Sequence, residues 1–543
     1  MRSVMGLLPS FLHGLSLQGL RRVSVFALAA PLALLLAACA SAPPPGPRPP
    51  PAFAIAPQSS GVWAQTETQV AAQHGPELSG FRLLDRNAEG LKWRLALIDQ
   101  AKHSMDLQYY VWFGDASGQL LMARVIAAAE RGVKVRLLFD DLSTMLRHMS
   151  APELRDEMLA AIDSHPNIQV RTFNAWQKRD WLGRVFEGAS EFSRINRRMH
   201  NKQMVVDNRV AIIGGRNIGD EYFGMNAEFN FHDLDVLGVG PVARQASAVF
   251  DRYWNSDWVQ PIPASAAPTH FSTRARRITA ADIELPAAAA AHPAMKELLA
   301  GRHSWAAEQE ALSPMLAAGR SVVHTDSPSR AEGVQNHMPE AFRALMRSAQ
   351  KEVLITNAYI IPDPHFMQDL ADLQSRGVRV RILTNSLASH DVPAVNAHYE
   401  DWRAPILKTG AALHELKPDP AIKSEFVDSA PVRSGFSGLH SKAMVIDRQR
   451  SFIGSMNLDP RSEIINSEMG VIIDSPALAE RLAQRMERDM SSDNSWHLDL
   501  QGLQGDQQVV WRSADQLLER APARSNWQRL QSWFFKLMPS SYY

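Results

Sequence analysis

A duplicated pattern of residues constrains the fold of this chain more than any other feature of its sequence. The pattern is His-x-Lys-x4-Asp, six residues, Gly, two residues and Asn. The first copy is His200, Lys202, Asp207, Gly214 and Asn217, and the second is His440, Lys442, Asp447, Gly454 and Asn457. A single copy is expected by chance in roughly one chain of this length in several thousand. Two copies with identical spacing therefore predict two related halves.

Each copy predicts a β-hairpin. Residues two apart on a strand share a face, so His200 and Lys202 point the same way. The apolar residues 204–206 continue this strand, and a second apolar run at 210–213 returns after a turn. The hairpin then brings Asn217 back beside the histidine and the lysine.

Asp207 and Asp447 fall at the predicted turns of these hairpins. Asp is a favoured turn residue, so a structural role is the better interpretation of both. As members of the pattern, both still stand among the candidate catalytic residues, with His200, Lys202, Asn217, His440, Lys442 and Asn457.

The two copies belong to a larger repeat. A strand at 105–112, a helix at 118–131 and a strand at 132–139 precede the first copy, and 352–361, 366–376 and 377–383 repeat this order before the second. A strand, helix and strand with short connections imply a right-handed crossover. We expect an α/β fold of two pseudo-symmetric halves, each a mixed β-sheet flanked by helices, with the active site at their interface.

One imidazole, one ammonium group and one amide make half of a phosphodiester site. Lysine and asparagine donate to non-bridging oxygens, where negative charge needs stabilising. Glycine lets the backbone approach a phosphate closely. The candidate substrate-binding residues are therefore Gly214, Gly215, Gly454 and Ser455. Two facing halves can supply one neutral imidazole to attack phosphorus and one protonated imidazole to release the alcohol.

The paired motifs resemble those of the phospholipase D superfamily, whose mark is two His-x-Lys-x4-Asp motifs in one chain. Further strings, at 108–110, 196–202, 214–222, 384–388 and 459–462, look like those of the bacterial cardiolipin synthases of the C type. That resemblance runs from about Phe81 to the end of the chain. It implies a phosphatidyltransferase that makes cardiolipin from phosphatidylglycerol and phosphatidylethanolamine.

The resemblance also implies a mechanism without a cofactor. His200 attacks phosphorus, His440 protonates the departing alcohol, and a phosphohistidine then passes the phosphatidyl group to a second alcohol. In the superfamily an acid from one half serves the histidine of the other. We therefore pair Glu468 with His200 and Asp235 with His440, and we expect His232 and Asp233 to be neighbours only. No cluster of Asp, His or Cys has metal-ligand spacing, so no metal is expected.

The N-terminal sequence resembles a bacterial lipoprotein signal. Arg21 and Arg22 precede an uncharged apolar run at 23–38, and the lone cysteine of the chain, Cys39, follows it. We expect a signal peptide at 1–39 and lipidation of Cys39. Ala40 permits sorting to the outer membrane, so the expected location is a membrane-anchored lipoprotein facing the periplasm. An uncleaved signal anchor is the alternative. This leader is a departure from the resemblance, and it leaves topology and acceptor lipid open.

Composition divides the remaining chain. We expect a Pro/Ala-rich tether at 40–80, the first half at 81–259, a connector at 260–333, the second half at 334–489 and a helical, aromatic-rich tail at 490–543. The tail either docks on the core or binds a membrane interface. The aromatic and basic stretch at 176–186 leaves the same two alternatives open.

The balance of charged residues indicates which partners to expect. The chain has 57 Lys and Arg against 57 Asp and Glu, whereas nucleic-acid binders show a positive bias. The expected partners are phospholipid substrates and a membrane, and no nucleic acid is expected.

A hydrolytic phospholipase D or phosphodiesterase shares every catalytic residue and stays an alternative. A non-catalytic, lipid-anchored binding protein is a third reading, which two intact motifs disfavour.

Overall fold

The structure is a computed structural model that describes residues 49–141, 152–177, 181–262, 279–283, 304–328, 336–427, 435–503, 506–514 and 516–538. The expected signal peptide and Cys39 lie outside these residues. Residues 51–543 form one unit, and the description below concerns this unit. Within the described ranges, no helix is long and apolar enough to cross a membrane.

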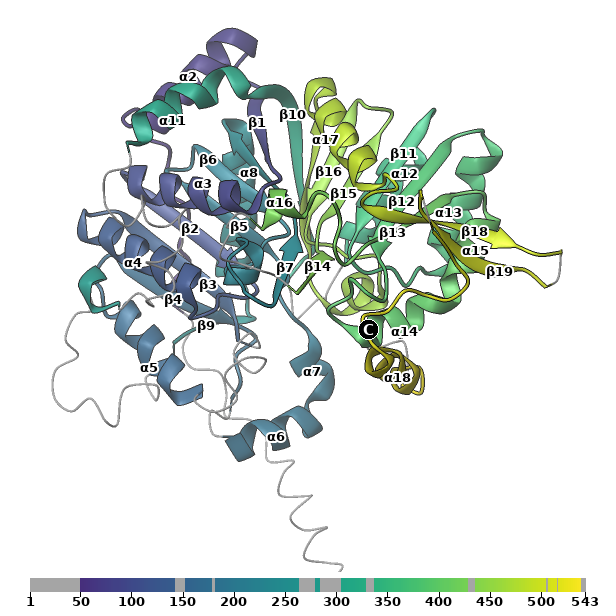
Figure 1. Cartoon of the computed structure of the whole chain (residues 1–543). Coiled ribbons are helices and arrows are strands. Elements are labelled where there is room, and N and C mark those ends of the chain that lie inside the picture. The colour runs from purple at the N-terminus through teal and green to yellow at the C-terminus, as the bar shows by residue number, and fades with distance from the viewer. Residues whose placement is uncertain are drawn as a thin grey trace, which may run out of the picture. The chain divides into compact units, whose positions relative to one another are not determined.

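Strands and helices alternate in the first half, as the repeat predicts (Figure 1). Its strands are β1 (Ser79–Leu84), β2 (Ser104–Tyr109), β3 (Lys134–Asp140), β4 (Ile168–Phe173), β5 (Lys202–Val206), β6 (Val210–Gly214), β7 (Phe229–His232), β8 (Asp235–Val239) and β9 (Val259–Pro261). Its helices are α2 (Val62–His74), α3 (Asn87–Gln100), α4 (Ala116–Glu130), α5 (Pro152–Asp163), α6 (Trp181–Ser190), α7 (Phe192–Asn196) and α8 (Pro241–Trp254).

The second half repeats this order after α11 (Trp305–Leu312) and β10 (Ala317–Thr325). Its strands are β11 (Glu352–Asn357), β12 (Arg379–Asn385), β13 (Ala412–Leu416), β14 (Phe436–Leu439), β15 (Lys442–Ile446), β16 (Arg450–Gly454), β17 (Met469–Asp474), β18 (Ser495–Gln501), β19 (Gln508–Arg512) and β20 (Leu517–Leu518). Its helices are α12 (Met338–Arg347), α13 (Pro364–Ser375), α14 (Pro393–Tyr399), α15 (Arg403–Lys408), α16 (Lys423–Phe426), α17 (Pro476–Asp489) and α18 (Asn526–Phe535).

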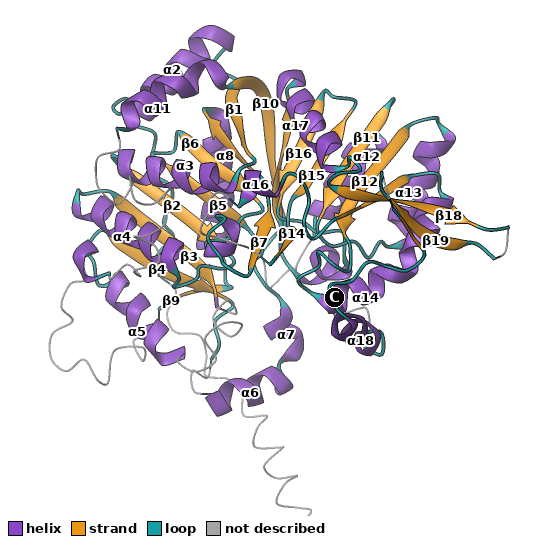
Figure 2. Ribbon diagram, viewed as in Figure 1, coloured by secondary structure: helices purple, strands orange, loops and turns teal. Residues whose placement is uncertain are grey.

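One continuous mixed sheet runs through both halves (Figure 2). Its order is β9-β4-β3-β2-β5-β6-β8-β1-β10-β17-β16-β15-β11-β12-β13-β18-β19-β20. The parallel set β2-β3-β4 corresponds to β11-β12-β13, and the antiparallel set β5-β6-β8 corresponds to β15-β16-β17. The halves join where β1 pairs with β10. The expected fold of two related α/β halves is confirmed.

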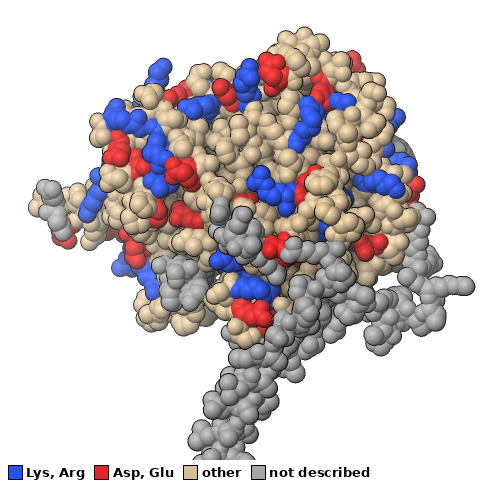
Figure 3. Space-filling model, turned by 180° about the vertical axis from the view of Figure 1, so that it is seen from behind, with Lys and Arg blue, Asp and Glu red and all other residues tan. Residues whose placement is uncertain are grey.

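A shared hydrophobic core fixes one half against the other. Helix α8 contributes Phe250 and Trp254, and helix α17 contributes Leu482 and Met486, to a single buried cluster that also includes strand residues of both halves. Because this core belongs to neither half alone, it holds the two motif hairpins in a fixed relation. Figure 3 shows Lys and Arg interspersed with Asp and Glu over the rear face, in keeping with the balanced composition.

The aspartate of each motif occupies a left-handed turn and caps a neighbouring strand. Asp207 and Asp447 have φ of 54° and 53°, and the residue after each is left-handed too. The Asp207 carboxylate accepts from the backbone N–H groups of Lys102, His103 and Ser104, just before and at the start of β2. Asp447 accepts in the same way from residues 350–352, at the start of β11. Both aspartates therefore have structural contacts.

Three expected boundaries differ from the structure. Helix α2 lies within the expected tether, where Trp63 and Val70 are buried. Strand β10 lies within the expected connector and joins the two halves of the sheet. The expected helical tail also contains β18 and β19, which extend the second half's sheet. The composition of the expected tether and connector predicts neither α2 nor β10, because composition does not report packing or pairing with residues far along the chain.

Replacing Asp207 by Asn should lower the free energy of unfolding by about 1–3 kcal/mol, because charge-assisted hydrogen bonds to three backbone N–H groups are weakened. Urea unfolding followed by circular dichroism measures this change. Asp419→Asn is the control, because that carboxylate is exposed and, among the residues that the structure describes, pairs only with Lys423. Equal stability of the two variants would contradict the capping role.

Candidate active site

His200 is held by a carboxylate from the other half. Its Nδ1 lies 2.9 Å from Oε2 of Glu468, and its backbone N–H donates to the Ser467 carbonyl at 2.8 Å. The Ser455 hydroxyl donates to the same carboxylate. Glu468 thus lies where the sequence argument places it. The contact leaves Nε2 of His200 as the ring nitrogen available to a substrate.

His440 has the matching arrangement with a different acid from the one expected. Its Nδ1 lies 2.6 Å from Oδ2 of Asp233, and its backbone N–H donates to the His232 carbonyl at 2.9 Å. The expected pairing of His440 with Asp235 is wrong. Asp235 is instead buried in ion pairs with Arg94, at 3.0 Å, and Arg216, at 3.1 Å.

Strand register explains the correction. Gly214 of the first motif pairs with Asp235, and Gly454 of the second pairs with Gly470. Asp235 therefore corresponds to Gly470, and the residue two positions earlier, Asp233, corresponds to Glu468. In the sequence, Asp233 and Glu468 are each followed directly by an apolar residue and, three positions later, by a valine. Aligning the two copies on these residues would have revealed the correspondence.

Each motif lysine is buried beside a tyrosine. Lys202 donates to the His200 carbonyl and lies 5.3 Å from the centre of the Tyr110 ring. Lys442 donates to the His440 carbonyl and lies 5.6 Å from the Tyr359 ring. Tyrosine rings also contact the histidines edge-on. The centre of the Tyr110 ring lies 5.1 Å from that of His200, and a further tyrosine, Tyr222, lies 5.3 Å from His440. Tyr110 and Tyr222 belong to the strings that look like those of the cardiolipin synthases, but the contacts of these tyrosines with the site were not anticipated.

The remaining expected residues support this geometry. Asn217 bonds to Val111 and Tyr222 through the two ends of its amide, and Asn457 is buried. Glycine is required at Gly214 and Gly454, because an added Cβ would lie 2.5 Å from an atom of the next strand. At Gly215 the Cβ would lie 2.3 Å from the Asp233 carboxylate. The structure thus gives Gly214, Gly215, Gly454 and Ser455 packing or orienting contacts.

Burial and positive charge keep His200 neutral. Burial, followed by the charges of Lys202, Lys442 and Arg461, holds the pKa of His200 well below its ordinary value. Burial also raises the pKa of its partner Glu468 to about 7. Since Lys442 belongs to the other half, its effect shows that the two motifs share one electrostatic environment. A neutral imidazole near pH 7 is the form that can act as a nucleophile.

The other pair is biased differently. Burial and Lys442 lower the pKa of His440. Burial acts to raise the pKa of Asp233, but the charges of His440, Lys442 and Arg216 outweigh it and hold this pKa below its ordinary value. An anionic phosphodiester would offset the lysine charges, and the imidazole beside the ionised Asp233 would then gain a proton first. On this electrostatic argument we expect His440 to act as the acid.

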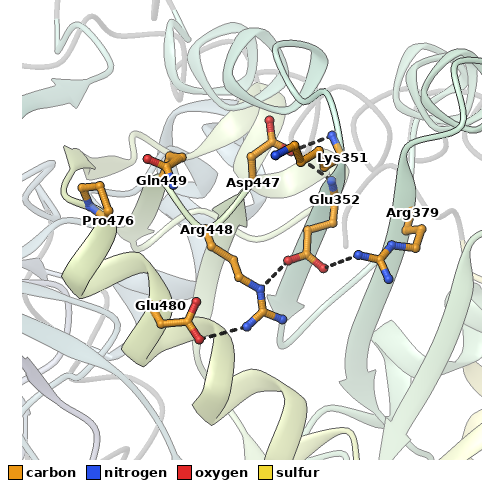
Figure 4. A pocket seen from close by; sticks show the side chains of 8 residues that line it. All are labelled: Lys351, Glu352, Arg379, Asp447, Arg448, Gln449, Pro476 and Glu480. Atoms are coloured by element: carbon orange, nitrogen blue, oxygen red, sulfur yellow. Dashed lines mark hydrogen bonds and ion pairs between the residues drawn. The ribbon is translucent and has the colours of Figure 1, made fainter.

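A surface hollow at the turn end of the second motif is separate from the histidine site. It is a cavity of about 410 Å³ lined by Glu352, Arg379 and Arg448 together with Lys351, Asp447, Gln449, Pro476 and Glu480 (Figure 4). Asp447 lies at the turn end of β15, whereas His440 precedes its other end. The charged groups there are largely paired with one another. Among the described residues, no group of three or more His, Cys, Asp or Glu is arranged to hold a metal ion.

Comparisons with known proteins place this site in a family. Residues 95–254 and 342–490 match the family described as "Cardiolipin synthase, PLD-like domain". The chain is 36% identical to cardiolipin synthase C of Escherichia coli over 87% of its own length and 97% of that protein. It is 26% identical to cardiolipin synthase B of Shigella flexneri, over 73% and 76% of the two chains.

The chain belongs to this family. It is a phosphatidyltransferase of the phospholipase D type. The fold agrees with the crystal structure of a phosphatidylserine synthase from Haemophilus influenzae, with a TM-score of 0.51 at 16% identity over 78% of this chain and 91% of that one. The family assignment covers both halves, so the two histidine–carboxylate pairs belong to one phosphatidyltransferase.

Asp233→Asn should lower kcat by about 10²–10⁴-fold and leave the fold intact, because the imidazole of His440 loses its anionic partner. Asp235→Asn should instead lower the free energy of unfolding by about 3–5 kcal/mol, because Arg94 and Arg216 stay buried without their counter-ion. Turnover and urea unfolding of the two variants separate these effects. A folded Asp233→Asn enzyme with normal kcat would contradict the pairing.

The pH profile of kcat/KM should be bell-shaped, with limbs near pH 7 and pH 8. Glu468, with a pKa of about 7, loses its charge as pH falls. As pH rises, charge is lost from Lys442, whose pKa burial lowers to about 8, and from Lys202, whose pKa burial holds well below its ordinary value. Lys202→Arg combined with Lys442→Arg should shift the alkaline limb upward, because guanidinium keeps its charge. An unshifted limb, measured on a short-chain phospholipid dispersed as monomers, would contradict the assignment to the two lysines.

Proposed function

We propose that the enzyme makes cardiolipin by transferring the phosphatidyl group of phosphatidylethanolamine to phosphatidylglycerol, through a phosphohistidine at His200. The observation that carries this proposal is the pair of imidazoles, each bonded through Nδ1 to an acid of the opposite half. That arrangement leaves an Nε2 of each ring for the reaction. Cardiolipin synthase C of Escherichia coli, similar over nearly its whole length, supports the choice of product.

The reaction proceeds in two displacements. Nε2 of His200 attacks phosphorus, the bond from phosphorus to the ethanolamine oxygen breaks, and His440 gives that oxygen its proton. Nε2 of His440 then removes the proton from a glycerol hydroxyl of phosphatidylglycerol. That oxygen attacks phosphorus, the P–N bond breaks, and His200 is restored. Lys202 and Lys442 stabilise the charge on the non-bridging oxygens in both steps.

Burial of the site favours transfer over hydrolysis. His200 and His440 are 8% and 5% exposed, and Tyr110, Tyr222 and Tyr359 surround them. Excluding water protects a reactive intermediate from hydrolysis. Positioning of an acceptor alcohol can supply an effective molarity of about 10⁵ M or more, which outweighs the concentration of water.

The cellular setting is also a proposal. We infer from the apolar run at 23–38 and the cysteine after it that the chain is a lipoprotein anchored at Cys39, facing the periplasm from the outer membrane. Metabolic labelling with a palmitate analogue, compared with Cys39→Ser, tests the anchor.

The enzyme should convert phosphatidylglycerol and phosphatidylethanolamine into cardiolipin and free ethanolamine in equal amounts. Deuterated acyl chains on phosphatidylethanolamine should enter the cardiolipin, and mass spectrometry measures this. His200→Ala should abolish turnover and the phosphohistidine while the enzyme stays folded. Asp419→Asn, on the exposed surface, is the matched control.

Other products would change the conclusion. Phosphatidic acid without cardiolipin would identify a hydrolase. Unlabelled cardiolipin with free glycerol would make phosphatidylglycerol the donor. Normal turnover by a folded His200→Ala enzyme would refute the nucleophile.

A further inference from the structure

Helix α18 is docked with its polar side inward. The buried residues of this helix are Gln528 and Ser532, both 3% exposed. Gln528 donates to the Leu387 carbonyl, and the Ser532 hydroxyl bonds to Glu400 at 3.2 Å. A helix that docks on a protein normally buries its apolar stripe, so this orientation needs an explanation.

Most apolar residues of α18 and of the turn after it face outward, and of these apolar residues only Phe535 is partly buried. Trp527, Trp533 and Leu537 are 65%, 61% and 70% exposed, and Leu530 and Phe534, each 52% exposed, complete the set. The positions 527, 530, 534 and 537 follow helical spacing, so these side chains form one continuous surface. We call these five residues the aromatic face. Contiguous exposed apolar surface of this kind marks a binding surface.

The segment that begins α18 is connected to the active site by direct contacts. Arg524, just before α18, donates to the His390 carbonyl, and the ring of His390 stacks on Tyr359 at 5.2 Å. Tyr359 in turn lies beside His440 and Lys442. Helix α18 packs against α14 (Figure 1), and a short chain of contacts thus joins it to the reacting groups.

Charge and residue type identify the occupant. Residues 520–538 contain four basic residues and no Asp or Glu. Lys536 pairs with Glu400 and Asp401, whereas Arg520, Arg524 and Arg529 are exposed. Tryptophan favours the boundary between lipid and water, and basic residues beside an apolar helix face are attracted to anionic lipids. On the His200 side, Phe186 of α6 is 67% exposed and Phe192 of α7 is 48% exposed, so aromatic residues flank both halves of the site.

We infer that the aromatic face of α18 inserts into the surface of an anionic phospholipid bilayer and so presents the active site to its lipid substrates. The inference rests on the proposed function, because it takes the substrates to be bilayer phospholipids. A face docked in this way leaves a head group only a short path from the bilayer to His440. The same surface contact would restrict water at the mouth of the site.

A local probe tests insertion independently of catalysis. In the full-length chain carrying Cys39→Ser, a single cysteine at Leu530 or Trp533 is labelled with an environment-sensitive fluorophore. Val322, which is 54% exposed on β10, is the matched control position. With phosphatidylglycerol vesicles, emission at 530 and 533 should shift to the blue and be quenched by brominated lipid, and the label at 322 should respond to neither.

Each other outcome of the probe experiment overturns the inference. An unresponsive label means that the face does not insert. Equal responses with phosphatidylcholine vesicles refute the anionic surface. If the label responds to protein concentration without vesicles, a second copy of the chain occupies the face. If the response disappears when residues 23–38 are deleted, that segment occupies the face.

An activity comparison separates docking from chemistry. Serine at Trp527, Leu530, Trp533 and Phe534 together should reduce turnover of phosphatidylglycerol vesicles by about tenfold or more. Turnover of monomeric short-chain phospholipid should stay unchanged. Val322→Ser with Leu503→Ser, two exposed apolar positions elsewhere, should change neither. Equal losses on both substrates would overturn docking, whereas a wild-type enzyme inactive on both would refute the proposed function and leave the probe result standing.

Discussion

The exchange of carboxylates between the two halves is the constraint on which this enzyme depends. His200 is bonded to Glu468, which directly precedes β17 in the second half. His440 is bonded to Asp233, in the loop before β8 of the first half. Each histidine also donates its backbone N–H to the residue just before that acid. Neither half therefore holds an oriented imidazole by itself. The orientation of each imidazole thus depends on both halves staying in one cooperative unit.

The shared core makes that exchange precise enough for catalysis. Helices α8 and α17 bury their apolar faces in one cluster with strands of both halves, and β1 pairs with β10 across the junction. A buried cluster of this size resists displacement, because any shift opens cavities in close-packed side chains. The position of Glu468 relative to His200 is thus set by packing far from the reacting atoms. The turn aspartates extend this control, since each ties its motif hairpin to the start of the central strand beside it.

Local periodicity predicted much of this fold, and long-range pairing escaped it. The strand–helix–strand units and the motif hairpins carry their own spacing, so their bounds follow from the sequence within a few residues. Strand β10 and the strands of the tail depend on partners far along the chain, which composition cannot report. Asp233 lies just before β8 and Asp235 is its first residue, so the two acids are only two positions apart. The register of β6 with β8 shows which acid pairs with arginines and which orients His440. Likewise, helical spacing in α18 predicts an apolar face without saying whether that face meets the protein or the solvent.

Asymmetry between two otherwise similar half-sites supports the proposed order of the reaction. A symmetric pair of imidazoles would share the roles of nucleophile and acid equally, so an assignment of roles needs environments that differ. Here a carboxyl with a pKa of about 7 faces His200, whereas the acid facing His440 lies among cations that keep it ionised. The ionised acid stabilises an imidazolium more strongly, so the proton that a bound phosphodiester attracts belongs on His440. The two copies thus differ where the proposed mechanism needs a difference, in the acid that faces each histidine and in the charges around that acid.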